Sequence, residues 1–229
     1  FSAQWALKNT GQNQGTAGID INYLPAREVT QGSSDIIVAV LDHGTQLDHP
    51  DLNVSSKSYD TETGRSPSQI WGNHGTACSG IISAKTNNNL GVAGIAPNCP
   101  VMSISNQLMG TSDAPQKRAD GFNWAWRNGA SVISNSWRSS TFSELLEDAI
   151  QSAMTNGRNG LGCVVTFSAG NYDSNTVGYP ARSLPDIIVV GALSLSGKRK
   201  SSTTIDNEGW WGSDYGTQLD IMAPGVLIY

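Results

Sequence analysis

The chain has 229 residues, a formal net charge of −5 and a pI near 5.0. This length suits one large α/β domain with a well-buried core. The acidic balance argues against a nucleic-acid partner, because positive charge gathers only at Lys198-Arg199-Lys200. No apolar run is long enough for a membrane span, so no membrane partner is expected. Three cysteines are too few for a disulfide framework, and a bridge between Cys99 and Cys163 stays undecided.

The N-terminal residues 1–34 are polar and glycine-rich, and we expect them to form an irregular arm that leads into sheet and helices over residues 35–229. The first strand is predicted at Ile36–Leu41, where a run of apolar and mostly β-branched residues indicates burial on both faces. Later apolar runs predict strands at Val101–Ile104, Val132-Ile133, Val164–Phe167, Ile187–Val190 and Leu219–Met222.

Helices are predicted between these strands. The segment His74–Ile82 consists largely of small and apolar residues, which let a helix lie close to a sheet. A second helix is predicted over Gln116–Asn128, with Gly129 as its C-cap. A third begins at a capping box of Thr141 and Glu144 and carries an apolar stripe of Leu145, Leu146, Ala149, Ile150 and Ala153. This alternation predicts a doubly wound, mostly parallel sheet of about seven strands with helices on both faces, in a single domain over residues 1–229.

Three polar residues that could carry chemistry stand at strand ends or at a helix start. Asp42 directly follows the first strand, His74 opens a helix, and Asn171 comes shortly after the strand at Val164–Phe167. Such positions converge on the carboxyl edge of a parallel sheet. A carboxylate can orient an imidazole, the imidazole can shuttle protons, and an amide can donate to an oxyanion. The three residues predict an acyl-transfer site, although each type is also common as a structural cap or turn residue.

Longer motifs surround these residues, at Val38–Gly44, His74–Gly80 and Ser168–Asn171. In this order they resemble three signature blocks of the subtilisin-like serine proteases. The connecting segments of that family resemble Gly91–Pro97, Val189–Ala192 and Met222–Gly225. The resemblance implies a subtilisin-like fold and a secreted or cell-surface serine endopeptidase that cleaves protein or peptide substrates through an Asp-His-Ser triad. It implies Asp42 and His74 as triad members and Asn171 as oxyanion donor. Cys78, one helical turn after His74, is expected to pack as a small apolar residue.

The family carries its nucleophile in a Gly-Thr-Ser-x-Ala block after the Ala-Pro-Gly segment, and this sequence reaches Tyr229 without that block. We therefore expect the chain to be inactive alone, with the serine on a segment after Tyr229, either a second chain formed by cleavage or a continuation. The start at Phe1 is either a boundary of the given sequence or a mature end left by zymogen processing. Gly110-Thr111-Ser112 is similar to the block, but polar and charged residues follow it, so Ser112 is not expected to be the nucleophile.

The resemblance also implies a substrate-binding groove. Ser136-Trp137-Arg138 would lie along the substrate backbone, opposite Ser168-Ala169-Gly170, so that an extended peptide adds as a strand. Gly178 would form the floor of the first specificity pocket, which favours a large apolar side chain of the substrate.

Asp51 and the loop Asn87–Val92 resemble the calcium site of the family. A carboxylate, an amide and loop carbonyls supply the oxygen ligands that a hard cation needs. The implied ligands are the side chains of Asp51 and Asn88, the carbonyls of Thr86, Leu90 and Val92, and Gln4 from the arm. The alternative is an uncharged, asparagine-rich turn that binds no metal.

Two other functions stay open. A related pseudoprotease would bind peptide without cleaving it, and only the missing serine segment separates it from the enzyme. The stretch Leu41–Thr45 is also similar to aspartate-dependent phosphotransfer sites at strand ends. It lacks the second aspartate that such sites place two residues along, and phosphotransfer leaves His74 and Asn171 unexplained.

Overall fold

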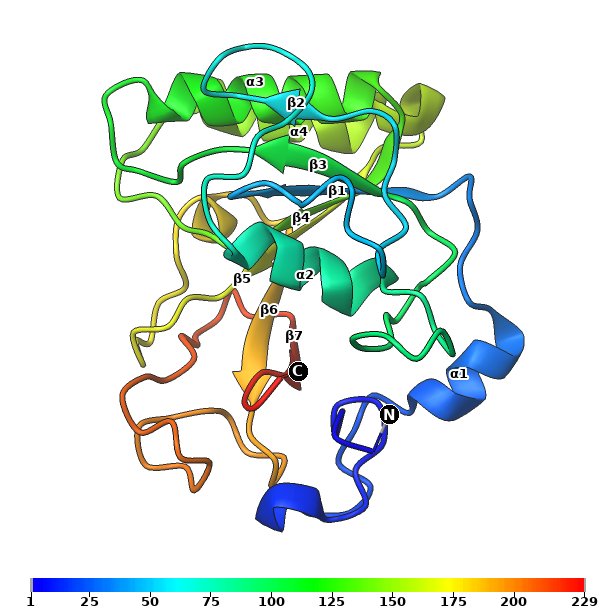
Figure 1. Cartoon of the computed structure of the whole chain (residues 1–229). Helices are drawn as coiled ribbons and strands as arrows, with labels where there is room; N and C mark the ends of the chain where they lie inside the picture. Colours follow the sequence, from blue (N-terminus) through cyan, green and yellow to red (C-terminus); the bar gives the residue numbers. More distant parts are fainter. Residues whose placement is uncertain (1, 229) are drawn as a thin grey trace. The chain divides into compact units, whose positions relative to one another are not determined.

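A computed structural model describes residues 2–228 of the chain (Figure 1). Tyr229, where the sequence predicts cleavage or continuation, lies outside the described residues. The described residues divide into two compact units, and each is described by itself. The central unit comprises residues 31–166, and the terminal unit comprises residues 2–30 and 167–228.

The described strands are β1 Ile37–Asp42, β2 Tyr59–Asp60, β3 Val101–Ser105, β4 Ala130–Asn135, β5 Val164–Ser168, β6 Ile188–Leu193 and β7 Ile221–Pro224. The described helices are α1 Tyr23–Val29, α2 His74–Ser83, α3 Ala114–Arg127 and α4 Glu144–Gly160, with short 3-10 helices η1 Gln12–Gln14 and η2 Ala181–Ser183. These seven strands form a sheet in the order β2-β3-β1-β4-β5-β6-β7. Parallel pairing of β1 with β3 and β4, of β3 with β2, and of β6 with β7 confirms the predicted α/β class. Within residues 2–228, every helix is too short or too polar to span a bilayer.

The central unit buries β1 on both faces, as predicted. Helices α3 and α4 lie side by side on one face, with α3 against β1 and β3, and α2 covers the opposite face (Figure 1). Gly121 lets α3 approach closely, because a Cβ there would lie 2.9 Å from Leu41 Cδ1 and 3.1 Å from Ile104 Cγ2. Leu41 and Ile104 are fully buried at this contact. The close packing of α3 therefore fixes the carboxyl half of β1.

The start of α4 differs from the prediction. Its N-cap is Ser143, whose Oγ accepts a hydrogen bond from Leu146 N at 3.3 Å, so the predicted capping box with Thr141 is wrong. Leu145 is 47% exposed and does not belong to the apolar stripe. The stripe that is buried consists of Leu146, Ala149, Ile150 and Ala153. Leu145 points away from it because neighbouring helical residues are rotated by about 100°.

The N-terminal arm is more regular than the sequence predicts, since it contains η1 and α1. Helix α1 has seven residues and a single buried one, Tyr23, so it shows no apolar stripe that a pattern could detect. In the terminal unit the arm is anchored by Trp5, which is fully buried and donates from Nε1 to the Val226 carbonyl at 2.8 Å. The sequence does not predict β2 either, because two residues are too few to show the alternation of buried and exposed side chains that marks a strand.

A buried ion pair organises the loop that follows β6 in the terminal unit. The side chains of Lys200 and Asp206 are fully buried and lie 3.0 Å apart. The Lys200 ammonium also donates to the Ser201 carbonyl, the Thr204 hydroxyl and the Glu208 carbonyl, at 2.8–3.1 Å. Burial by itself raises the pKa of Asp206, but the hydrogen bonds from Thr204 and Lys200 outweigh it, and the pKa is lowered. The ammonium thus fills a cage of oxygens such as metal cations occupy in other loops.

Replacing Lys200 by methionine should lower the free energy of unfolding by about 3–5 kcal/mol, because it leaves the Asp206 carboxylate buried without its partner. Urea unfolding at neutral pH measures this loss. It should shrink as the pH falls below the ordinary pKa of aspartate, where Asp206 takes up a proton. The exposed Lys198→Met is the matched control and should change stability by less than about 0.5 kcal/mol. If both variants lost the same free energy of unfolding, the buried Lys200 ammonium would not be what stabilises this loop.

Candidate active site

The turn after β1 and the first turn of α2 touch through their backbones. Gly44 has a φ of +90°, and a Cβ there would collide with the Gln69 carbonyl. A Cβ at Gly75 would lie 2.5 Å from the Gly44 carbonyl oxygen and 3.0 Å from the Gly44 nitrogen. Glycine at both positions therefore lets the start of α2 lie directly against the end of β1.

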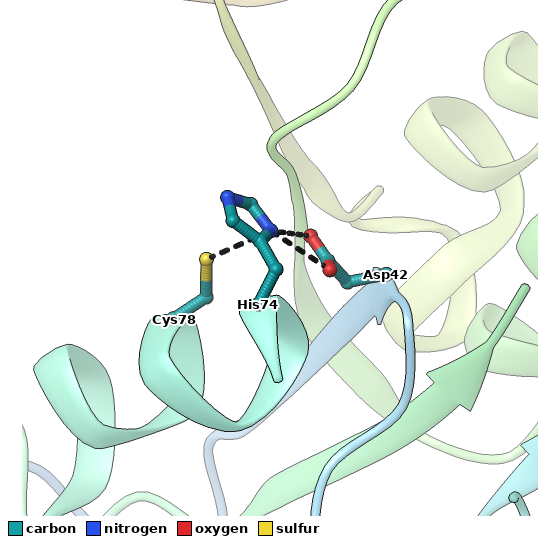
Figure 2. Close-up of side chains that lie close together, drawn as sticks. All are labelled: Asp42, His74 and Cys78. Carbon is teal, nitrogen blue, oxygen red and sulfur yellow. Dashed lines mark hydrogen bonds and ion pairs between the residues drawn. The ribbon is translucent and has the colours of Figure 1, made fainter. Parts of the chain in front are cut away.

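This contact brings Asp42 and His74 together (Figure 2). The side chain of Asp42, the last residue of β1, is 1% exposed, and both of its carboxylate oxygens lie 2.9 Å from His74 Nδ1. Oδ1 also accepts a hydrogen bond from His43 N at 2.7 Å. The His74 side chain is 51% exposed, and its Nε2 lies on the side of the ring away from the carboxylate (Figure 2). Asp42 thereby holds the proton on Nδ1 and leaves Nε2 to exchange protons with other groups.

The electrostatics of the pair follow from this geometry. The hydrogen bond to Asp42 raises the pKa of His74 from 6.5 to about 10, Cys78 adds to the increase, and partial burial opposes it. Because the folded-state pKa is raised, the contact stabilises the fold fully below about pH 6.5, and this contribution is lost as the pH rises through about 10. The imidazole becomes a base only as the pH rises through that pKa.

Cys78 lies on the same side of α2 as His74 (Figure 2). Its Sγ is 3.8 Å from His74 Nδ1 and 3.8 Å from Ser136 Oγ, and the residue is partly exposed, so it does more than pack as a small apolar residue. The Asp42 carboxylate, the His74 imidazole and the Cys78 thiol thus form one cluster, with polar atoms within 4.8 Å of one another. Cys78 is a free thiol, and so are the two cysteines whose pairing the sequence left undecided, Cys99 and Cys163.

A parallel α/β sheet with a buried carboxylate that orients an exposed imidazole is typical of serine hydrolases with a catalytic triad. The model of the subtilase family matches residues 33–228, and the chain belongs to the subtilase family.

The chain is similar to proteases over most or all of its length. The thermophilic serine proteinase of Bacillus sp. (strain AK1) is 34% identical over 232 residues, which cover 100% of this chain and 53% of the relative. Subtilisin NAT of Bacillus subtilis subsp. natto is 34% identical over 201 residues, which cover 85% of this chain and 48% of the relative. The calcium-dependent protease of Nostoc sp. is 30% identical over 254 residues, which cover 99% of this chain and 36% of the relative. The chain therefore spans about half the length, or less, of these curated relatives.

The segment Ser136–Arg138, predicted to bind substrate, follows β4 without forming a regular strand. Arg138 is exposed, whereas Trp137 is 6% exposed and donates from Nε1 to the Leu41 carbonyl at 3.0 Å. The Trp137 side chain thus supports the end of β1. Ser112, the other serine considered from the sequence, lies exposed in the turn before α3.

In the terminal unit, Asn171 is exposed just beyond the carboxyl end of β5. Ser168 is the last residue of that strand, and the buried Ala169 accepts a hydrogen bond at its carbonyl from Gly178 N at 2.9 Å. Gly170 has a φ of +119°, which favours glycine. The structure therefore brings Ala169 and Gly178 together, while their role in a substrate pocket and the convergence of Asn171 with His74 stay predictions.

Asp214 shapes the loop that carries Asn171 and could not be found from the sequence. Its carboxylate is fully buried, and Oδ1 accepts hydrogen bonds from Tyr172 N and Ser174 N, each at 2.9 Å. Its own backbone nitrogen donates to the Gly170 carbonyl at 2.8 Å. No local pattern marks this aspartate, because its partners lie far away along the chain.

The predicted calcium ligands Asp51 and Asn88 are adjacent in the central unit. Asn88 Nδ2 donates to Asp51 Oδ1 at 2.6 Å, and Val92 N donates to Oδ2 at 3.3 Å. The Asn88 oxygen accepts a hydrogen bond from Leu90 N at 3.1 Å. This donor set fits a hard cation by its chemistry, provided that the amide turns its oxygen toward the carboxylate.

Two further ligands that the sequence predicts are Thr86 and Gln4. Thr86 is partly buried and comes shortly before Asn88 in the same loop. Gln4 belongs to the terminal unit, where its carbonyl accepts hydrogen bonds from Leu7 N at 3.0 Å and Lys8 N at 3.3 Å. The roles of both as ligands stay predictions.

Replacing Gly75 by alanine should lower the pKa of His74 from about 10 toward 6.5, because the new Cβ collides with the Gly44 backbone and separates α2 from Asp42. An NMR titration of the imidazole protons measures the change. Gly80→Ala is the matched control in the same helix, because a Cβ there meets only Val92 Cγ2, at 4.0 Å. It should leave the pKa of His74 unchanged. If the pKa of His74 fell equally in both variants, the contact at Gly75 would not be what holds His74 against Asp42.

Proposed function

We propose that this chain is the N-terminal major portion of a subtilisin-like serine endopeptidase. The observation that carries the proposal is the pair of hydrogen bonds from His74 Nδ1 to the buried Asp42 carboxylate. This arrangement supports a general base, because it fixes the tautomer in which Nε2 accepts the proton. Membership of the subtilase family and the relatives named as proteases support the same reaction.

The mechanism follows from the roles of three groups. His74 Nε2 takes the proton of the serine hydroxyl as its oxygen attacks the substrate carbonyl, and Asp42 stabilises the imidazolium that forms. His74 then gives the proton to the leaving amine. The Asn171 side-chain amide donates to the oxyanion of the tetrahedral intermediate. Because only the unprotonated imidazole accepts a proton, the rate should rise with pH above neutrality.

We further propose that the nucleophilic serine belongs to a segment outside these 229 residues, as a continuation or as a second chain formed by processing. An open apolar face in the terminal unit supports this. In β6, Val189 is 1% exposed on one face, but Ile188 on the other is 39% exposed. Val190 on that open face pairs with Ile221 of β7, which is 58% exposed. A helix bearing the serine would cover this face, and the chain without it would be inactive.

The proposed substrate is a protein or peptide held in extended form along Ser136–Arg138 and Ser168–Gly170. Gly178, which is buried beside Ala169, would leave room in the first pocket for a large apolar side chain. We also propose that the enzyme is secreted or displayed at the cell surface, with the processing of a zymogen.

With the serine segment present, Asp42→Asn should lower kcat on a peptide substrate by about 10⁴, the size found for the equivalent change in other serine proteases. The cause is the wrong imidazole tautomer. Asp48→Asn makes the same substitution at an exposed position in the turn after β1 and should leave the rate unchanged. Labelling by an organophosphonate should locate the serine. An unchanged rate in Asp42→Asn would refute its role, and peptide binding without cleavage or labelling would identify a pseudoprotease.

We propose a structural calcium ion at Asp51, whose buried carboxylate faces the loop of Asn88 and Val92. A relative named as a calcium-dependent protease supports this proposal. Chelation should lower the melting temperature by roughly 5–10 °C from its value at calcium about 100 times the Kd. Asp51→Asn should abolish this response, and Asp48→Asn should retain it. A wild-type melting temperature that does not respond to chelation would exclude the metal.

A further inference from the structure

The central unit contains a buried guanidinium that the proposed mechanism does not use. Arg118, in α3, is 2% exposed, although the polar sequence around it predicts an exposed position. Among residues 2–228 no carboxylate forms an ion pair with it, and its Nε has no hydrogen-bond partner. Burial lowers the pKa of the Arg118 guanidinium, and Glu62 offsets this only by its charge. A charge buried without a close counter-ion is costly, so it requires a compensating contact.

The first compensating contact is with Trp137. The guanidinium carbon of Arg118 lies 4.8 Å from the centroid of the Trp137 ring, and the ring itself is buried. A cation over an indole face is bound most strongly where both partners are removed from water. Trp137 is therefore held in one orientation by Arg118.

The second contact fixes the loop before α3. Arg118 Nη2 donates to the Met109 carbonyl at 3.2 Å. The same side chain thus contacts two segments, the loop that contains Met109 and the segment after β4 that contains Trp137. Its position between them explains why a charge is kept in the interior of the unit.

Trp137 passes this constraint on to the end of β1. Its indole Nε1 donates to the Leu41 carbonyl at 3.0 Å. Leu41 is fully buried and directly precedes Asp42, whose carboxylate holds His74 Nδ1. A cation on the ring face also polarises the indole N–H and strengthens it as a donor.

We propose that Arg118 is a positioning residue of the active site, which fixes the end of β1 through Trp137 and so sets the orientation of Asp42 toward His74. This inference rests on the proposed function, in which the Asp42–His74 pair is the acid–base machinery. Arg118 itself touches neither residue of the pair. Its influence passes through one ring and one hydrogen bond, and each can be removed separately.

The test is an NMR titration of His74 in the full protein. Arg118→Met removes the charge and keeps the length of the side chain, and Trp137→Phe keeps an aromatic face but removes the indole N–H. Each should shift the pKa of His74 down by about half a unit or more. Arg118→Lys, which keeps a cation, should leave the pKa of His74 close to its wild-type value. The double variant should shift it no further than either single variant, because both break the same relay.

Arg127→Met is the matched control. Arg127 lies on the same helix and also stacks over a tryptophan, Trp126, at 5.1 Å, but it is exposed. It should leave the titration of His74 unchanged. If Arg118→Met and Trp137→Phe lower the melting temperature but leave the pKa of His74 at the wild-type value, Arg118 is merely structural and the proposal is wrong. If Arg118→Met does not fold, Arg118→Gln, which also removes the charge, takes its place, and an unchanged pKa of His74 in Trp137→Phe still overturns the proposal.

The titration tests the role of Arg118 independently of the proposed protease reaction. The titration requires no turnover, so it can succeed or fail whatever the outcome of serine labelling. Where the enzyme is active, Arg118→Met should lower kcat more than it raises KM, since it disturbs the acid–base pair. A change in KM alone would overturn the proposal and assign Arg118 to the loop of Met109.

Discussion

The contact between the α2 backbone and the turn after β1 is the constraint on which the proposed active site depends. At Gly44 and Gly75 no side chain fits, so strand, turn and helix approach to backbone distance. That approach allows the buried Asp42 carboxylate to meet His74, and without the meeting the carboxylate would be buried with only a backbone donor. Glycine at these two positions therefore makes possible the contact between Asp42 and His74 on which the proposed chemistry rests.

Buried carboxylates recur as organisers of the loops. Asp42 accepts a hydrogen bond from the backbone of the next residue, Asp51 from Val92, and Asp214 from two nitrogens beyond Asn171. A carboxylate that accepts backbone N–H groups holds a loop more firmly than a neutral acceptor, because charge-assisted hydrogen bonds are stronger. The loop of the proposed catalytic pair and the two supporting loops thus share one structural device, a buried carboxylate that accepts backbone N–H groups.

The sequence predicts the parts of this structure that depend on local patterns. The run Ile36–Leu41 predicts β1 because a continuous apolar run can be recognised without knowing its partners. The end of that strand then indicates Asp42, and the start of the next predicted helix indicates His74. The sequence does not predict that Arg118 and Asp214 are buried. The contacts that offset the desolvation of a buried charge come from residues far away along the chain, and no local pattern shows them. The predicted cap of α4 is wrong for a related reason: Thr141 and Ser143 are both good N-cap residues, and the sequence does not show that Leu146 N donates to Ser143.

The cage around Lys200 has a consequence for how the protein meets its surroundings. A cation that is part of the chain cannot be lost by dilution, exchanged for a competitor or removed by a chelator. The segment 200–211 therefore keeps its shape in any ionic medium, and its exposed Ile205 and Trp210, at 88% and 77%, are presented in a constant arrangement. The order of a metal-bound loop depends instead on the concentration of the metal in the medium. If the proposed calcium site is present, this chain therefore contains one loop whose stability depends on calcium and one whose stability does not.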